Sequence, residues 1–170
     1  MRNLFTALFL LATTALSAQH VSTPTNGIIV QGKTEKEYSF PLTMLDTFAT
    51  QSLPEFIITN HLGEKKRTLT GLRGVLLTKV LENVKFTTPN PKALSEFYFV
   101  LVANDGYKVV YSWNELFNSP IGDKVFIITQ KDGKKLKDIE DRIVIASFSD
   151  LRTGRRYVEG VEKIIVARIE

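Results

Sequence analysis

Two short groups of side chains carry the chemistry that this sequence offers. The first is Asn60-His61, which follows an apolar run ending at Thr59 and precedes Gly63. An imidazole changes charge near neutral pH and can serve as a base or a ligand, and residues at strand ends often line clefts. A lone histidine is also frequently a surface or hydrogen-bonded residue, so the sequence leaves both roles open.

The second group is the basic segment from Arg152 to Tyr157, which reads Arg-Thr-Gly-Arg-Arg-Tyr. A guanidinium binds phosphate through two parallel hydrogen bonds, and a glycine lets backbone N–H groups approach an anion. Arg155 and Arg156 are therefore candidate anion contacts. The alternative is a solvated turn whose charges keep the protein soluble, and these residues by themselves favour that alternative.

Composition excludes much other chemistry. The 170 residues contain no cysteine and two histidines, His20 and His61. This excludes disulfides, a cysteine nucleophile, iron–sulfur clusters and thiolate or histidine-rich metal sites. The chain also lacks the G-x-S-x-G pattern of hydrolases, the H-E-x-x-H pattern of zinc proteases and the G-x-G-x-x-G pattern of dinucleotide-binding loops. We assign no catalytic residue and no metal ligand from the sequence.

The N-terminal segment, residues 1–18, has the features of a secretory signal peptide. Arg2 gives a positive start, residues 4–16 are almost continuously apolar, and Ser17 and Ala18 end a zone of small residues. We place cleavage after Ala18, with Ser17 as the alternative, and expect a periplasmic or secreted protein. A buried N-terminal helix is the competing interpretation. The apolar run is shorter than the roughly 20 residues that cross a bilayer, so the mature chain is expected to have no membrane span.

Removal of residues 1–18 takes away Arg2 and no acidic residue. The mature chain then has 21 basic and 18 acidic side chains, a formal charge of +3. This excess is too small to indicate a nucleic-acid partner. Residues 19–26 are polar and lack periodicity, so we expect a flexible lead-in there and a single domain over residues 27–170.

The elements that must position the two groups are mainly strands. Alternating or β-branched apolar residues predict strands at 28–30, 36–40, 56–59, 65–69, 97–103, 107–111, 125–129, 134–136, 142–148 and 161–169. The turns at 104–106 and 132–133 are typical of tight hairpins. Apolar residues at helical spacing predict a helix over 76–84, and Ser112 with Glu115 forms a capping pattern that begins a second, shorter helix.

Many short strands with two or three inserted helices indicate an α+β fold built on mixed β-sheets with short inserted helices. The apolar run Ile164-Ile165-Val166 further predicts that the last strand is buried on both faces. The strand–helix alternation of a doubly wound fold is absent from the sequence pattern.

Four segments follow one another in a recognisable order: IIVQGKTEKEYSFPLTML, RTLTGLRGVLLTKVLENV, NDGYKVVYSWNELFN and GRRYVEGVEKIIVARI. In order and spacing they resemble the molybdopterin-binding oxidoreductase domain of the sulfite oxidase superfamily. The resemblance covers nearly the whole mature chain. It implies a sulfite-oxidase-like α+β fold whose mixed sheets enclose a cleft for a molybdopterin cofactor.

The resemblance also implies a metal-binding cysteine just before the TLTGL stretch, and the matching residues 57–61 contain none. Because thiolate is the soft ligand that secures such a metal, we interpret the chain as a small exported, cofactor-degenerate member that binds a small anion or pterin ligand. Asn60 and His61, beside the missing ligand, and Arg155 and Arg156, in the last motif, are the implied cofactor-binding residues. Two alternatives stay open, an active molybdopterin-dependent oxidoreductase without a protein thiolate and an envelope protein-interaction module.

Overall fold

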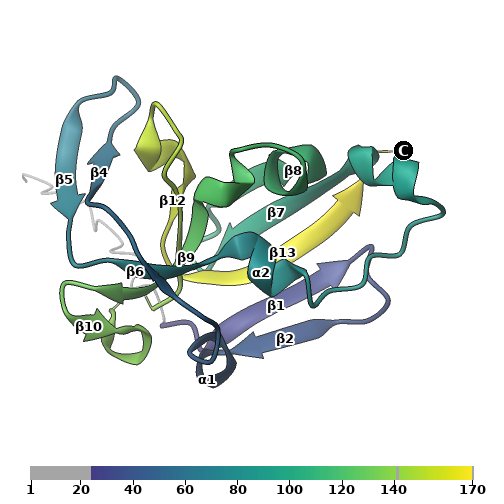
Figure 1. The fold of residues 1–170 in the computed structure, drawn as a ribbon, viewed down its shortest axis with the longest axis horizontal. Coiled ribbons are helices and arrows are strands. Elements are labelled where there is room, and N and C mark those ends of the chain that lie inside the picture. The colour runs from purple at the N-terminus through teal and green to yellow at the C-terminus, as the bar shows by residue number, and fades with distance from the viewer. Residues whose placement is uncertain (1–23, 141, 170) are drawn as a thin grey trace, which may run out of the picture.

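The computed structural model of the chain describes residues 24–140 and 142–169 (Figure 1). The expected signal peptide over residues 1–18 and the first part of the lead-in lie outside this range. Thr25 is already buried, and the carbonyl of Asn26 accepts a hydrogen bond from the N–H of Leu42 at 3.1 Å. The chain is therefore anchored from Thr25 onward, two residues before the expected start of the domain.

The first of three sheets in the described chain is mixed. Its strands are, in spatial order, β2 (Tyr38–Pro41), β1 (Gly27–Gly32), β13 (Val161–Arg168), β7 (Phe97–Ala103) and β8 (Lys108–Ser112). β1 and β13 run parallel, and the other neighbouring pairs are antiparallel. The predicted hairpin at 104–106 is confirmed as β7–β8, and β1 and β2 form a second hairpin. The first and last strands lie side by side within the sheet (Figure 1).

The second sheet is antiparallel. Its strands are, in spatial order, β12 (Tyr157–Val158), β11 (Val144–Ser147), β9 (Val125–Lys131), β6 (Arg73–Leu76) and β3 (Gln51–Ser52), with β10 (Lys134–Lys135) paired to β9. The sequence pattern missed β6, because a glycine usually weakens a strand. Gly74 is required there by close packing, since a Cβ atom would lie 2.9 Å from the carbonyl oxygen of Ile127.

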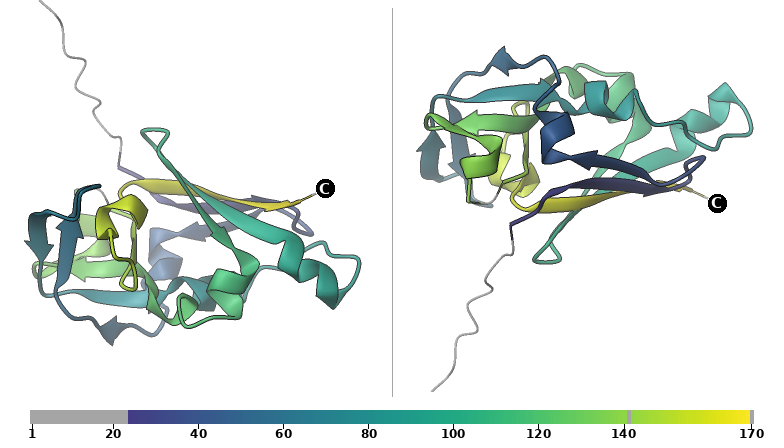
Figure 2. Two further views of the ribbon diagram at one scale, coloured as in Figure 1. Left: turned by 90° about the horizontal axis from the view of Figure 1, so that it is seen from above. Right: turned by 90° about the horizontal axis from the view of Figure 1, so that it is seen from below.

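A separate hairpin of β4 (Phe56–Thr59) and β5 (Lys65–Leu69) covers the outer face of the second sheet. The reason lies in β9, whose apolar side chains alternate between two cores. Val125 and Ile127 face the main core, whereas Phe126 and Ile128 face a second core shared with the hairpin. The hairpin lies at one end of the molecule, opposite η1 (Pro91–Glu96), as two perpendicular views show (Figure 1, Figure 2).

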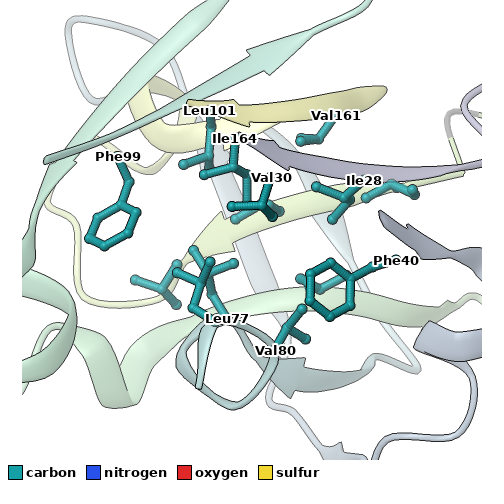
Figure 3. Packing of buried hydrophobic residues seen from close by; sticks show 14 of the residues in the cluster. Ile28, Val30, Phe40, Leu77, Val80, Phe99, Leu101, Val161 and Ile164 are labelled. Carbon is teal, nitrogen blue, oxygen red and sulfur yellow. The ribbon is translucent and has the colours of Figure 1, made fainter. Parts of the chain in front are cut away.

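The main core fills the space between the first two sheets (Figure 3). The short helix α2 (Leu77–Leu81) contributes Val80 to it, beside Phe40 and Val30 from the first sheet. The predicted helix over 76–84 is confirmed in position but ends early, because the side-chain amide of Asn83 donates to the carbonyls of the last turn.

The remaining helical elements are single turns between strands. They are α1 (Leu42–Leu45), α3 (Trp113–Phe117) and the 3₁₀ turns η2 (Gly122–Lys124), η3 (Leu136–Asp138) and η4 (Thr153–Arg156). The predicted α+β fold with mixed sheets and short inserted helices is thus confirmed. In the described range, none of the helices has the length and apolarity needed to cross a membrane.

One sequence-based expectation about burial is wrong. In β13, Ile164 and Val166 are buried but Ile165 is only half-buried, so this strand is covered on one face and not on both. Two strands of the second sheet are covered on both faces: β9, in which residues 125–129 are all buried, and β11, in which all four residues are buried. β13 lies in the mixed sheet, and within residues 24–140 and 142–169 the other face of this sheet has no layer like the β4–β5 hairpin to cover it.

Candidate functional site

The Arg156 side chain is enclosed by two carboxylates and an aromatic ring. Its Nε and Nη2 donate to the two carboxylate oxygens of Asp150 at 2.7 and 2.6 Å. Its Nη1 donates to Oε1 of Glu115 at 2.9 Å, and its guanidinium carbon lies 4.4 Å from the centre of the Tyr111 ring. Most of the hydrogen-bonding capacity of this guanidinium is therefore used within the protein.

Glu115 is positioned by the capping box that the sequence predicts at the start of α3. The Oγ of Ser112 accepts from the N–H of Glu115 at 3.1 Å, and the Glu115 carboxylate accepts from the N–H of Ser112 at 2.8 Å. Burial raises the pKa of Glu115, but hydrogen bonds from Ser112 and Arg156 outweigh it and lower this pKa below its ordinary value. Hydrogen bonding to Asp150 is the main cause that raises the pKa of Arg156, so this guanidinium is charged at neutral pH.

Tyr111 lies next to this ion-pair network as a fully buried phenol. Burial raises the pKa of Tyr111 well above its ordinary value, so the hydroxyl is neutral. Over the described residues, this hydroxyl forms no hydrogen bond of ordinary geometry, although the neighbouring Ser147 hydroxyl slightly offsets the rise in its pKa. The nearby Ser147 Oγ donates instead to Oδ1 of Asp150 at 2.7 Å. The network thus fixes β8, β11 and α3 relative to one another while it leaves one buried polar atom unsatisfied.

Asn60 organises the turn between β4 and β5. Its Oδ1 accepts from the N–H groups of Leu62 and Glu64, both at 3.0 Å, and its Nδ2 donates to the Glu64 carboxylate at 2.7 Å. Gly63 completes the turn with a φ of +91°, which favours glycine. The Asn60 side chain is therefore committed to the turn, and His61 is exposed at the tip.

A second contact joins this hairpin to η4. The Thr153 hydroxyl accepts from the N–H of Thr59 at 3.0 Å and donates to the carbonyl of Ile57. At Gly154, a Cβ atom would lie 2.1 Å from the Thr59 carbonyl oxygen, and at Gly63 it would lie 2.7 Å from Nη1 of Arg152. The hairpin and the segment before β12 therefore pack directly against each other.

The structure brings the four sequence-predicted site residues to one end of the molecule, in two pairs. Asn60 and His61 occupy the tip of the hairpin, and Arg155 and Arg156 occupy η4. Arg155 is exposed, and its carbonyl accepts from the Tyr107 hydroxyl at 2.7 Å. Arg156 points instead into its ion-pair network. Cofactor binding by these four residues stays a prediction.

A cavity of about 460 Å³ opens beside the contact between the hairpin and η4. Its apolar lining includes three phenyl rings, in which Phe148 lies 4.7 Å from Phe56 and 5.5 Å from Phe126, centre to centre. Leu53, Pro54 and Ile57 complete the apolar lining. Polar groups at its rim come from Glu55, Asp123, Lys124 and Thr153, among other lining residues. None of the four predicted residues is among the described residues that line it.

This cavity has the size of a small-molecule site, and its lining is divided evenly between six apolar and six polar residues. Its three phenylalanines could have been suspected from the sequence, since Phe56 begins a strand, Phe126 lies near the start of another and Phe148 directly follows a third. The sequence could not predict that the three rings converge on one cavity, because they come from three different parts of the chain.

The string from Gly27 to Thr34 matches the G-x-x-x-x-G-K-[ST] pattern of phosphate-binding loops. In the structure its first six residues form β1, which pairs with β2 on one side and β13 on the other. The pattern requires a loop with free N–H groups before a helix. The match therefore carries no nucleotide site.

Metal-binding geometry is also absent from the described residues, in which no group of three or more His, Cys, Asp or Glu side chains is placed to hold an ion.

Comparison with known proteins finds a likeness among solved structures. No protein-family model matches the chain, and no curated protein sequence matches it. The sulfane dehydrogenase SoxCD from Paracoccus pantotrophus matches over 82% of this chain with a TM-score of 0.56 at 12% identity. The match covers 37% of the SoxCD chain, so this protein spans well under half of that length. At this identity the likeness shows a shared fold alone.

Proposed function

We propose that this protein is an exported, cofactor-degenerate relative of the sulfite oxidase superfamily that binds a small ring-containing ligand. The observation that carries the proposal is the cavity of about 460 Å³ with three converging phenyl rings. Support for the relationship comes from the four ordered sequence segments and from the fold shared with a sulfane dehydrogenase.

The cavity favours a flat ligand with one polar side. The rings of Phe56, Phe126 and Phe148 offer faces and edges against which another ring can stack. Lys124 and Asp123 at the rim offer a cation and a carboxylate, and Thr153 offers a hydroxyl. A ring that carries hydrogen-bonding substituents matches this division into an apolar part and a polar rim.

The residues on the chain do not fit a metal-bearing molybdopterin. No cysteine exists to supply a thiolate, and both ends of the Asn60 side-chain amide are used within its turn. The Arg156 guanidinium would have to leave Asp150 and Glu115 to bind a cofactor phosphate.

Export is proposed from residues 1–18, whose charged start, apolar centre and small-residue end match a secretory signal peptide. Mass spectrometry of the protein from a cell-envelope fraction tests this proposal. A mature N-terminus at Gln19, or at Ala18, supports it, and an intact Met1 contradicts it.

The binding proposal is tested by two-dimensional NMR titrations with two probes, indole and the pteridine lumazine. We expect shifts of the amide signals of Phe56, Lys124 and Thr153. A Phe148→Leu variant should weaken binding, whereas Phe117→Leu removes a half-buried ring from the Trp113 stack and should leave binding unchanged. If neither probe shifts these signals, the cavity does not bind flat rings and the proposal fails.

Cofactor content separates this proposal from an active molybdenum enzyme. The protein should be produced with its N-terminal segment in a host that makes molybdopterin, and analysed for molybdenum, tungsten and oxidised-pterin fluorescence. We expect neither metal nor pterin. About one metal and one pterin per chain would overturn cofactor degeneracy.

A further inference from the structure

We propose that the end of the molecule formed by residues 60–67 and 151–155 docks on an anionic lipid surface. We call these residues the basic loop end. Its two segments are far apart in the sequence but lie at the same edge of the molecule (Figure 1, Figure 2). They are fixed together by the Thr153 hydrogen bonds to β4 and by the packing of Gly63 on Arg152.

The basic loop end carries a concentrated positive charge. It contains five basic residues and one acidic residue, Glu64, an excess of four charges in 13 residues. The five basic side chains are all exposed: Lys65, Lys66, Arg67, Arg152 and Arg155. Arg67 also forms an ion pair with Glu159, which lies outside the two segments, so the excess with this neighbour included is three charges. After removal of residues 1–18 the whole chain has an excess of only three, so the remainder of the protein carries little net charge. The positive charge is thus a local feature and not a general property of the surface.

Apolar side chains protrude from the same loops. Leu151 is 89% exposed and Leu62 is 63% exposed, and each is adjacent in sequence to one member of the Gly63–Arg152 contact. Neither leucine lines the cavity beside η4. Leucines that extend from loop tips among cations can insert between lipid headgroups while the cations bind the headgroup phosphates.

These observations favour a lipid surface over a protein partner. A protein interface usually presents a packed apolar centre with aromatic anchors and a shaped complement. Here the exposed leucines stand on separate loop tips, and the surrounding residues are short turns and cations. A fluid anionic bilayer requires no shaped complement, so isolated apolar tips and clustered cations suffice.

The test is cosedimentation of the mature protein with vesicles of phosphatidylcholine alone and with vesicles containing about one third phosphatidylglycerol. We expect binding to the anionic vesicles at 0.15 M NaCl, and loss of this binding at 1 M NaCl because salt screens exposed charges. The double variant Lys66→Gln, Arg155→Gln should bind at least tenfold more weakly, since each cation near an anionic surface contributes roughly fivefold.

Two matched controls locate the docking surface. The double variant Lys134→Gln, Lys135→Gln removes the same charge from the exposed β10 and should bind as the unmodified protein does. Leu151→Ser should weaken binding, whereas Ile169→Ser, at a site 67% exposed near the C-terminus, should not.

The proposal is overturned if the protein does not bind anionic vesicles. It is also overturned if the two control variants weaken binding as much as the matching variants in the basic loop end do. It is also overturned if Leu151→Ser binds as the unmodified protein does. Capture of an acidic protein without vesicle binding would assign the surface to a protein partner and reject the lipid. Circular dichroism of each variant verifies that the fold is intact.

Discussion

The guanidinium of Arg156 and the carboxylate of Asp150 form a bidentate pair, with Nε 2.7 Å from Oδ2 and Nη2 2.6 Å from Oδ1. The Asp150 side chain is 9% exposed and that of Arg156 20% exposed, so the pair is largely shielded from water. Its position between η4 and β11 makes it a structural element at the edge of the candidate site. Arg156, which the sequence places in a candidate anion-binding motif, therefore has a structural role as the partner of Asp150.

Replacement of Arg156 should destabilise the protein strongly. Arg156→Ala leaves the carboxylates of Asp150 and Glu115 without their cation, and we expect a loss of about 3 kcal/mol in the free energy of unfolding. Arg156→Lys should recover only part of this loss, because an ammonium cannot form the two parallel hydrogen bonds. Urea denaturation measures both. The neighbouring exposed Arg155→Ala should change stability by less than about 0.5 kcal/mol. Equal effects at the two arginines would refute the structural role of Arg156.

The unsatisfied hydroxyl of Tyr111 should make Tyr111→Phe neutral or stabilising. Removal of a buried hydroxyl that has no partner avoids its desolvation, and we expect a gain of up to about 1 kcal/mol at pH 7. Tyr38→Phe is the matched control, because the Tyr38 oxygen accepts from the N–H of Lys85 at 3.1 Å. That variant should lose about 1 kcal/mol. A loss of similar size at Tyr111 would show that its hydroxyl is hydrogen-bonded.

Tyr111 also predicts a response to alkaline pH. Since burial raises the pKa of Tyr111 in the folded state, the unfolded chain releases this proton first, and stability should decline as pH rises above the ordinary tyrosine value of 10.0. The decline should be shallower in Tyr111→Phe. Thermal unfolding from pH 8 to 11 measures the difference, and identical slopes for the two proteins would contradict it.

Glu115 predicts the opposite response, at acidic pH. The pKa of Glu115 is lowered in the folded state, so the unfolded chain binds the proton first and stability falls as pH drops below the ordinary value of 4.5. Glu115→Gln should lower stability at pH 7 and flatten this acid dependence. Melting temperatures between pH 3 and 7 test both expectations. If the stability of the variant falls as steeply at low pH as that of the original chain, Glu115 does not contribute to the acid dependence of stability.

The contact between η4 and the β4–β5 hairpin should be sensitive to one methyl group. In Gly154→Ala the new Cβ atom would lie 2.1 Å from the Thr59 carbonyl oxygen, and relief of this clash should cost about 3 kcal/mol. Gly106 has a φ of +85° but open space around it, so Gly106→Ala should cost only about 1 kcal/mol of backbone strain. Urea denaturation compares them. Similar losses would mean that the hairpin shifts easily away from η4.

Local patterns in the sequence were sufficient for most elements of the fold. The hairpin turns at 104–106 and 132–133, the capping box of Ser112 and Glu115, and the strand periodicity all depend on residues within a few positions of each other. Such short-range preferences act before any tertiary contact forms. The α+β class followed from them, whereas the edge strands β3 and β12, of two residues each, are too short to produce a periodic signal.

Tertiary structure alone decided which side chains meet. The sequence grouped Arg155 with Arg156, but packing turned Arg156 toward Asp150 and Glu115 and left Arg155 exposed, because a buried guanidinium must find carboxylates while an exposed one is solvated. The rings of Phe56, Phe126 and Phe148 converge because β9 is covered on both faces by layers from distant segments. Neither the orientation of Arg156 nor the convergence of the rings can be predicted from spacing along the chain, since both depend on how separate strands are stacked.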